Sequence, residues 1–253
     1  MHKLSVVIIT LNEERNITRC LSSVKEVADD IVVVDSGSTD RTREICSQSD
    51  VNFIFHPWTG YSDQKNYANR QACYDWILSI DADEELSPEL IQSIKEAKNK
   101  TQIGYYKINR LTNYCGKWIK HGGWYPDIKL RIFDRNNTQW ECAIHEILTN
   151  EKKFPSVLLK GNCYHYTYYN ITEHIAQANK FSELSAQDMF QRGKKYGFIK
   201  LFISPLAKFI GNYVMRTGFL DGIYGLAIAC ISAQAVFWKY AKLKQMNRSY
   251  NKQ

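Results

Sequence analysis

The chain has 253 residues, 44% of them hydrophobic, which suits one large domain or a domain with an appendage. Its seven cysteines are odd in number and scattered without a C-x-x-C pair, which argues against a disulfide scaffold or a cysteine zinc site and favours reduced thiols in a cytosolic protein. From Met189 onward, eleven Lys or Arg stand against one acid, a net charge of +10, whereas residues 1–188 hold 22 basic and 25 acidic side chains, a net of −3.

Strands and helices alternate over the first hundred residues. Apolar, β-branched runs predict four strands, at Leu4–Thr10, Ile31–Val34, Val51–Phe55 and Trp76–Ile80. Helical spacing predicts helices between them, from Glu13 to about Val27, a short one after Asp40, and one from about Ser62 to Cys73. Strands and helices that alternate with short connections predict an α/β fold with a mostly parallel, doubly wound sheet and flanking helices.

Polar clusters follow three of these strands, at residues 10–13, 35–40 and 81–85. In parallel sheets ligands bind beyond the carboxyl ends of the strands, so the three clusters are expected to meet along one edge. Loops are polar for simpler reasons too, and that alternative accounts for any one cluster taken alone.

The third cluster is unusually acidic, because S-I-D-A-D-E-E-L (79–86) places four carboxylates directly behind a buried strand. Side chains alternate along a strand, so Asp81 and Asp83 are expected on the same side, where they repel unless a cation lies between them. Mg²⁺ or Mn²⁺ prefers such oxygen ligands and completes its shell with water and phosphates. The alternative is a solvated loop that caps the next helix, which is expected to start at Ser87-Pro88-Glu89.

Beyond residue 101 the pattern changes. Residues 102–160 mix aromatic residues and glycines with alternating runs at Ile103–Arg110 and Ile128–Phe133, which predict further strands and long loops. Thr172–Phe190 is an amphipathic helix by its spacing, and 198–243 is helical and much more apolar. We therefore expect a catalytic domain over residues 1–190 and a basic, apolar helical extension over 191–253.

Three stretches of the sequence are informative together: S-V-V-I-I-T-L-N-E-E, I-V-V-V-D-S-G-S-T-D and D-W-I-L-S-I-D-A-D-E. They closely resemble glycosyltransferase family 2, the inverting enzymes of the GT-A (Rossmann-like) fold. Three later stretches are H-G-G-W-Y-P-D-I-K-L-R-I-F (121–133), W-E-C-A-I-H-E (140–146) and Y-H-Y (164–166). They are similar to one branch of the family, which contains lipopolysaccharide core β-1,4-glucosyltransferases. The resemblance implies metal-dependent, inverting transfer of a hexose, first of all glucose, from a UDP-sugar to a hydroxyl of a lipopolysaccharide-core or other lipid-linked saccharide.

The resemblance also implies a nucleotide site. Asp35 would bind the uracil ring, Thr10 and Glu13 would line the same pocket, and Lys65 would meet base or phosphate oxygens. From the residues alone, Asp35 could equally cap a turn and Lys65 could be a solvated helix residue.

A divalent metal, Mn²⁺ or Mg²⁺, is implied beside the nucleotide. Asp83 would hold the metal, Asp81 the metal or the ribose, and His165 would be a late histidine ligand, as in many GT-A enzymes. His165 could also be an ordinary, partly buried histidine between Tyr164 and Tyr166.

Inverting transfer needs a base for the acceptor hydroxyl, and one carboxylate suffices because a nucleotide diphosphate leaves well with metal help. The candidates are Asp127, Glu141 and Glu146. Glu146 leads because it occupies the place of the family's E-D base, although here the pair reads His145-Glu146, and Asp127 is the second candidate. For acceptor binding, Trp124 and Tyr125 are expected to form a sugar platform, and Arg131 to meet a phosphate or carboxylate.

Two other functions fit parts of the sequence. A nucleotidyltransferase acting on a sugar phosphate also uses paired aspartates, but it would want a glycine-rich, basic first loop, and residues 10–14 are acidic without glycine. A non-enzymatic nucleic-acid-binding protein could use the basic tail, yet the tail lacks base-stacking motifs, so we expect no nucleic-acid partner.

The tail fits an anionic membrane surface better. Gly222–Trp238 is apolar over 17 residues, at the short limit for a spanning helix, and five cations and no acid follow it. Such a segment would hold a cytoplasmic enzyme on the inner face of the membrane, where lipid-linked acceptors are found. A hydrophobic helix packed on the protein is the alternative. Met1-His2-Lys3 leads straight into a strand, so no targeting signal is expected.

Overall fold

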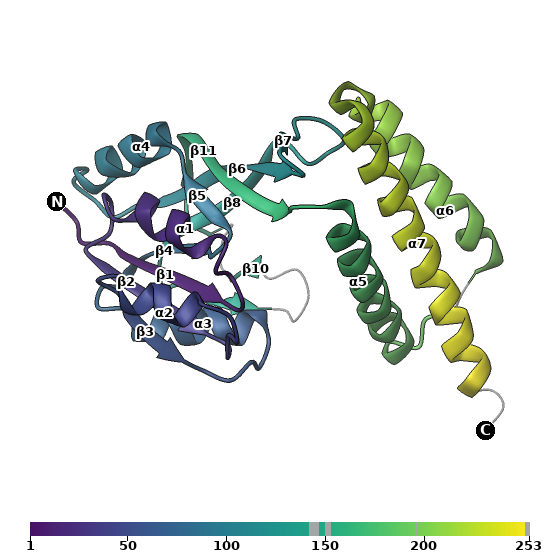
Figure 1. Cartoon of the computed structure of the whole chain (residues 1–253), viewed down its shortest axis with the longest axis horizontal. Helices are drawn as coiled ribbons and strands as arrows, with labels where there is room; N and C mark the ends of the chain where they lie inside the picture. Colours follow the sequence, from purple (N-terminus) through teal and green to yellow (C-terminus); the bar gives the residue numbers. More distant parts are fainter. Residues whose placement is uncertain (142–146, 150–152, 196, 251–253) are drawn as a thin grey trace. The chain divides into compact units, whose positions relative to one another are not determined.

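The computed structural model describes residues 1–141, 147–149, 153–195 and 197–250 (Figure 1). The chain forms two compact units, which we call the sheet unit (Met1–Arg110 and Asp127–Tyr166) and the helical unit (Leu111–Pro126 and Thr167–Gln253). The segment 111–126 and the helix after Tyr166 therefore belong to the same compact unit as the apolar C-terminal helices. The domain boundary expected after residue 190 stays a prediction.

The first half of the sheet unit is parallel, as predicted. Its strands lie in the order β3-β2-β1-β4, with bounds β1 Ser5–Thr10, β2 Asp30–Asp35, β3 Asn52–Phe55 and β4 Trp76–Asp81. The connecting helices are α1 Ile17–Val24, α2 Thr42–Ser47 and α3 Tyr61–Gln71. Thr10 lies opposite Asp35 and Ile9 opposite Asp81, so the strand ends, and the polar residues that follow them, share one edge.

The continuous apolar runs are explained by burial on both faces of the sheet. Val6 and Ile8 of β1 belong to a core with Ile17 and Leu21 of α1. Val7, which points to the other side, packs in a second core with Ala68 of α3 and with neighbouring strands. The predicted α/β fold with flanking helices is therefore confirmed.

The second half of the sheet is antiparallel. β8 (Asp127–Asp134) pairs with β4, and the order continues through β6 (Tyr105–Tyr114), β11 (Ser156–Tyr168) and β5 (Glu84–Leu86). β7 (Lys117–Trp118) pairs with β6, and β9 (Trp140–Glu141) with β10 (Ile147–Leu148). The segment expected to decorate the sheet thus extends it. The acidic stretch itself supplies β5, and α4 (Pro88–Lys98) follows at the predicted start, where Ser87 Oγ accepts from Leu90 N at 3.2 Å.

The helical unit contains α5 (Ile171–Gln191), α6 (Phe198–Ile210), a π-helical turn (Gly211–Met215), a 3₁₀ turn (Gly218–Asp221) and α7 (Gly222–Tyr250). Figure 1 shows α6 alongside α7, and α7 also packs against α5. The apolar C-terminal region is thus helical, as predicted. Tyr114, Ile119 and Ile228 form its buried centre, surrounded by half-buried aromatic side chains.

Candidate active site

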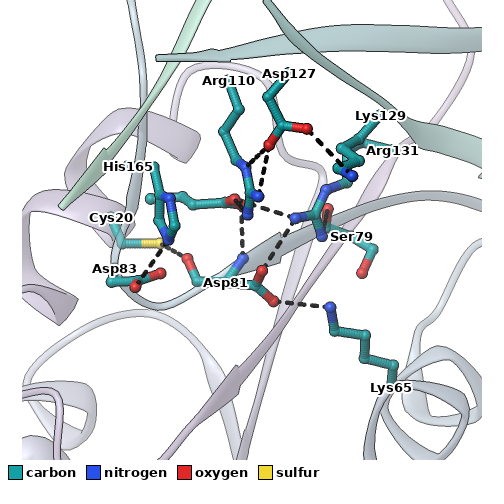
Figure 2. Close-up of polar contacts among 11 residues, drawn as sticks. Cys20, Lys65, Ser79, Asp81, Asp83, Arg110, Asp127, Lys129, Arg131 and His165 are labelled. Atoms are coloured by element: carbon teal, nitrogen blue, oxygen red, sulfur yellow. Dashed lines mark hydrogen bonds and ion pairs between the residues drawn. The ribbon is translucent and has the colours of Figure 1, made fainter. Parts of the chain in front are cut away.

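Asp81 lies at the end of β4, between two cations of the protein (Figure 2). Its Oδ1 is 3.0 Å from Lys65 Nζ on α3, and its Oδ2 is 3.0 Å from Arg131 on β8. Burial alone would raise the pKa of Asp81, but the positive charges of Lys65 and Arg131 outweigh it and hold the pKa well below its usual range. Asp81 is therefore ionised, and the protein itself balances its charge.

Glu84 is the buried centre of the same network. Its side chain is 0% exposed, and its Oε1 accepts from Arg131 at 3.1 Å and from Arg110 at 3.3 Å. Its Oε2 accepts from the backbone N–H of Asp81 at 3.0 Å. Burial would lower the pKa of Arg131, but the charges of Glu84 and Asp81 raise it above its usual range. Two of the four clustered carboxylates, Asp81 and Glu84, are thus neutralised by cations of the protein.

Asp83 and His165 form a separate pair (Figure 2). β4 ends at Asp81 and β5 starts at Glu84, so Asp83 lies in the turn between them, and the expected strand alternation of Asp81 and Asp83 is wrong. His165 lies opposite Glu84 in the β11–β5 pairing, and its Nε2 is 3.2 Å from Asp83 Oδ2. Burial lowers the pKa of His165, but the charge and hydrogen bond of Asp83 outweigh this effect and raise it.

This pair fits a divalent ion. Carboxylate oxygen and imidazole nitrogen are donors that Mn²⁺ and Mg²⁺ accept. Among the described residues no three His, Cys, Asp or Glu side chains are arranged as a complete metal site, and both oxygens of Asp81 already contact cations. Burial, and then the charge of Asp83, raise the pKa of Glu13 to about 7. Asp83 and His165 would supply two ligands and leave the others to diphosphate and water.

The predicted nucleotide residues lie at the ends of β1 and β2. Asp35 Oδ2 accepts from the backbone N–H groups of Gly37 and Ser38, both at 2.9 Å, and Oδ1 accepts from Ser38 Oγ. Asp35 thus does cap a turn: its Oδ2 already accepts two hydrogen bonds, and its Oδ1, with one, retains capacity for another donor. The buried hydroxyl of Thr10 has no hydrogen-bond partner within the part of the chain that the structure describes.

Lys65 is not a solvated helix residue. Its side chain is only 7% exposed, its Nζ bonds Asp81, and it lies 4.8 Å from the ring centroid of Trp140. Within the described part of the chain Asp81 is its one carboxylate partner, which leaves two N–H donors of the ammonium group for phosphate or base oxygens.

The structure describes one of the two leading candidates for the catalytic base. Glu146 lies outside the described residues. Asp127 is 2.6 Å from Arg110 Nη2 and 3.2 Å from Lys129 Nζ. Burial would raise the pKa of Asp127, but these cations, Arg110 first, lower it, which makes this carboxylate a weak proton acceptor.

Trp124 and Tyr125 belong to the helical unit. The ring centroid of Trp124 is 5.8 Å from those of Tyr114 and His174, in edge-to-face contacts, and Tyr125 precedes Pro126 through a cis peptide bond. Their binding of an acceptor sugar stays a prediction. Arg131, the third predicted acceptor residue, has a side chain that is 5% exposed and bound by carboxylates of the sheet unit.

Arg131→Met should therefore destabilise the fold by roughly 3–5 kcal/mol, because it leaves the buried charge of Glu84 short of a partner. Lys129→Met, on the same strand, removes an exposed cation paired with Asp127 and should cost less than about 1 kcal/mol. Urea unfolding of both variants measures the difference. An unchanged unfolding free energy in Arg131→Met, with weaker acceptor binding alone, would support the acceptor role instead.

Sequence reasoning missed Glu84, Arg110 and Asn12. Asn12 adopts a positive φ of 56° and links two strand ends, since its Oδ1 accepts from Thr39 N at 2.8 Å. Its own N–H donates to Ser38 Oγ at 2.8 Å. An asparagine directly after a buried strand is a local signal for such a turn. For Glu84 and Arg110 no local signal exists, because their pairing depends on antiparallel strands distant in sequence.

Comparison with known proteins agrees with this geometry. The profile of glycosyl transferase family 2 matches residues 5–152. An uncharacterised glycosyltransferase of Rickettsia typhi is 34% identical, over 98% of this chain and 88% of its own length. The lipopolysaccharide core biosynthesis glycosyltransferase LpsC of Rhizobium meliloti is 29% identical, over 94% of this chain and 93% of its own.

Among solved structures, the mannosyltransferase PcManGT of Pyrobaculum calidifontis, in complex with GDP-Man and Mn²⁺, has a similar fold. It has a TM-score of 0.53 and 14% identity, and covers 95% of this chain and 86% of its own. The matched profile spans more than half of the chain and includes all three strand-end clusters. The chain therefore belongs to glycosyltransferase family 2.

Proposed function

We propose that this glycosyltransferase moves a hexose, first of all glucose, from a UDP-sugar to a hydroxyl of a lipopolysaccharide-core or other lipid-linked glycan, with inversion at the anomeric carbon. The observation that carries the proposal is the Asp83–His165 pair, which lies beside the Asp81–Lys65 ion pair at the edge where β1 and β2 end. Family membership and the relative named for lipopolysaccharide core biosynthesis support the transfer and the acceptor class.

In this proposal the nucleotide lies against the ends of β1 and β2. Asp35, fixed by the turn at Gly37 and Ser38, accepts the N–H of the uracil ring. Thr10 and Glu13 line the same pocket. Lys65 is held by Asp81 and directs its remaining N–H donors at base or phosphate oxygens.

Asp83 and His165 would hold Mn²⁺ or Mg²⁺, and Asp81 would contact the ribose or the metal. When bound, the ion stabilises the negative charge of the departing diphosphate. His165 is oriented by its place in β11, opposite Glu84, and Asp83 by the backbone hydrogen bond from Tyr166 N to Asp83 O at 2.9 Å. The pair is thus held by strand pairing and not by a loop alone.

Glu146 takes the proton of the acceptor hydroxyl as that oxygen attacks the anomeric carbon from the face opposite UDP. Its competitor Asp127 is less suited, because Arg110 and Lys129 hold its pKa low. Trp124 and Tyr125 form the sugar platform on the acceptor side.

The proposed enzyme works in the cytoplasm, at the inner face of the membrane, through its C-terminal segment. Of the described residues, Gly218–Arg248 is one helical stretch long and apolar enough to cross a membrane by length and composition, which alone is weak evidence. The net charge of +10 from Met189 onward favours an anionic lipid surface.

A panel of nucleotide sugars tests this function. UDP-glucose with Mn²⁺ or Mg²⁺ should raise the unfolding temperature of the protein more than GDP- or ADP-sugars do, because a ligand that binds the native state stabilises it by mass action. Protection by UDP-glucose should weaken in Asp35→Ala. Equal protection by nucleotides with any base would contradict the uracil site.

A further inference from the structure

The outer face of α6 carries an exposed apolar stripe. Its residues recur at helical spacing, so they lie on one side of the helix, and they are Ile199, Phe202, Ile203, Leu206 and Ile210. Leu201, on another side, is buried. A surface helix of a soluble protein normally turns its apolar stripe toward the core, whereas α6 leaves this one exposed.

The stripe continues along the chain into the two turns that follow α6. Val214, Met215, Phe219 and Leu220 of these turns are exposed, as is Ile223 in the first turn of α7, with Met215 at 76% and Ile223 at 69%. Ring contacts tie the two turns to α6, because Tyr213 stacks on Phe209 at 5.4 Å and meets Phe219 at 6.2 Å. We call the ten exposed residues of α6, the two turns and the first turn of α7 the apolar face.

The segment that carries the apolar face is strongly basic, with a net charge of +10 from Met189 onward. Lys208, seven residues after the buried Leu201, lies on the side of α6 away from the stripe, where burial and then the charges of Arg216 and Lys239 lower its pKa. None of these three cations has an ion pair with a carboxylate among the described residues. Asp221, the one acid after Met189, is buried and accepts from His121 N at 2.8 Å. The helical unit therefore combines an exposed apolar face with a strong excess of positive charge, which complements an anionic lipid surface.

Beyond its first turn, α7 packs within the helical unit, although its sequence predicts membrane binding more strongly than that of α6. Four of its apolar residues are buried, namely Ile228, Ala229, Ile231 and Leu243. Lys242, in the expected polybasic end, donates to Asn179 Oδ1 and Ser182 Oγ at 2.9 Å and pairs with Glu183 at 3.1 Å. This helix is engaged within the helical unit, as the packed alternative predicts.

We infer that the apolar face of α6 and its following turns lies in the headgroup region of an anionic bilayer, as a peripheral anchor that does not span it. The partner is the lipid surface itself. Exposed aliphatic and aromatic side chains enter the acyl boundary, and the basic side chains of the segment after Met189 are attracted to lipid phosphates.

The same turns hold the predicted acceptor loop, which gives the anchor a second consequence. Gly122 N donates to the carbonyl oxygen of Arg216 at 2.9 Å, and Asp221 holds His121. Gly123 leaves room for Arg216, because a Cβ there would be 2.5 Å from its Nη1. A docked anchor would therefore fix Trp124 and Tyr125 relative to the bilayer. This point rests on the proposed function, and so does the membrane association that the apolar face would supply.

Vesicle sedimentation of the full chain tests the anchor. The protein should bind vesicles of equal parts phosphatidylcholine and phosphatidylglycerol at low salt, and much less to phosphatidylcholine alone. Ile203→Ser with Leu206→Ser should weaken this binding at least tenfold. Val157→Ser with Leu158→Ser, which removes two exposed aliphatic side chains from β11, should leave it unchanged. Equal unfolding temperatures would show that all variants are folded.

Charge variants separate α6 from the tail. Lys200 is exposed and follows Ile199 of the stripe, so Lys200→Gln should reduce binding to the anionic vesicles by about fivefold. Lys242→Gln also removes one charge, but from a lysine that bonds Asn179, Ser182 and Glu183, and should have no effect on binding. An effect of Lys242→Gln that equals or exceeds that of Lys200→Gln would overturn the assignment to α6.

Two further results would overturn it. One is a solution dimer that Ile203→Ser with Leu206→Ser dissociates while vesicle binding persists, since a second copy would then cover the face. The other is extraction from membranes by detergent alone and never by salt. UDP-sugar hydrolysis by water, measured without vesicles, reports the proposed function separately, so the two can fail independently.

Discussion

Asp83→Ala is expected to lower sugar transfer by roughly a thousandfold or more while the protein stays folded. The variant removes the carboxylate beside His165 Nε2, and with it an oxygen ligand for the ion that stabilises the departing diphosphate. Asp83 is partly exposed, and among the described residues its carboxylate forms an ion pair with His165 alone, so the fold depends little on it. Release of UDP in the presence of Mn²⁺, with the unfolding temperature alongside, measures both effects.

Asp75→Ala is the matched control, because it removes an exposed aspartate that pairs with Arg135 and should leave transfer unchanged. Asp81→Asn should behave differently from both, since it weakens the hold on Lys65 and Arg131 and lowers nucleotide affinity even without metal. Undiminished transfer in excess chelator would contradict the role of Asp83.

Glu146→Gln is expected to retain UDP-sugar and metal affinity but to lose turnover by about a hundredfold to ten-thousandfold, the usual contribution of a general base. The amide preserves size and polarity and loses only the ability to take a proton. Single-turnover rates, together with a separate UDP titration, measure the two quantities.

Asp127→Asn is the natural comparison for this variant. It weakens the pairing with Arg110 and Lys129 and should reduce stability more than turnover. A rate close to wild type in Glu146→Gln, with Asp127→Asn inactive, would move the role of base to Asp127.

The parallel half of the fold could be predicted from the sequence because its signals are local. Each strand is a short apolar run, and Ser87 caps α4 as its position before Pro88 predicts. Register then aligns Thr10 with Asp35 and Ile9 with Asp81, which brings the strand-end clusters to one edge. The topology rule for parallel sheets accounts for that edge without any knowledge of side-chain contacts.

The charge balance inside the site could not be predicted in this way. Glu84 is bound by Arg110 and Arg131, which lie 26 and 47 residues away in sequence, and antiparallel pairing alone brings them together. In a sequence, consecutive acidic residues indicate a solvated loop, and nothing local marks Glu84 as the one that becomes buried. Arg131 alternates with apolar neighbours, which predicts exposure on a one-sided sheet, whereas this sheet is covered on both faces.

In the helical unit, too, the helices could be predicted from the sequence but their exposed faces could not. Apolar content predicts helices from residue 198 onward, and the structure contains them. Which face of a largely apolar helix is covered depends on its neighbours, so the sequence singled out Gly222–Trp238 while the structure leaves the stripe of α6 exposed.

The anomeric configuration of the product tests inverting transfer most directly. UDP-glucose, α-linked and isotopically labelled at its anomeric carbon, is incubated with the enzyme, Mn²⁺ and a glycolipid extract of the cell envelope. NMR of the purified product should show a β-linked glucose, because the acceptor oxygen attacks the face opposite UDP. An α-linked product would contradict the single-base mechanism and the roles assigned to Glu146 and the edge of the sheet.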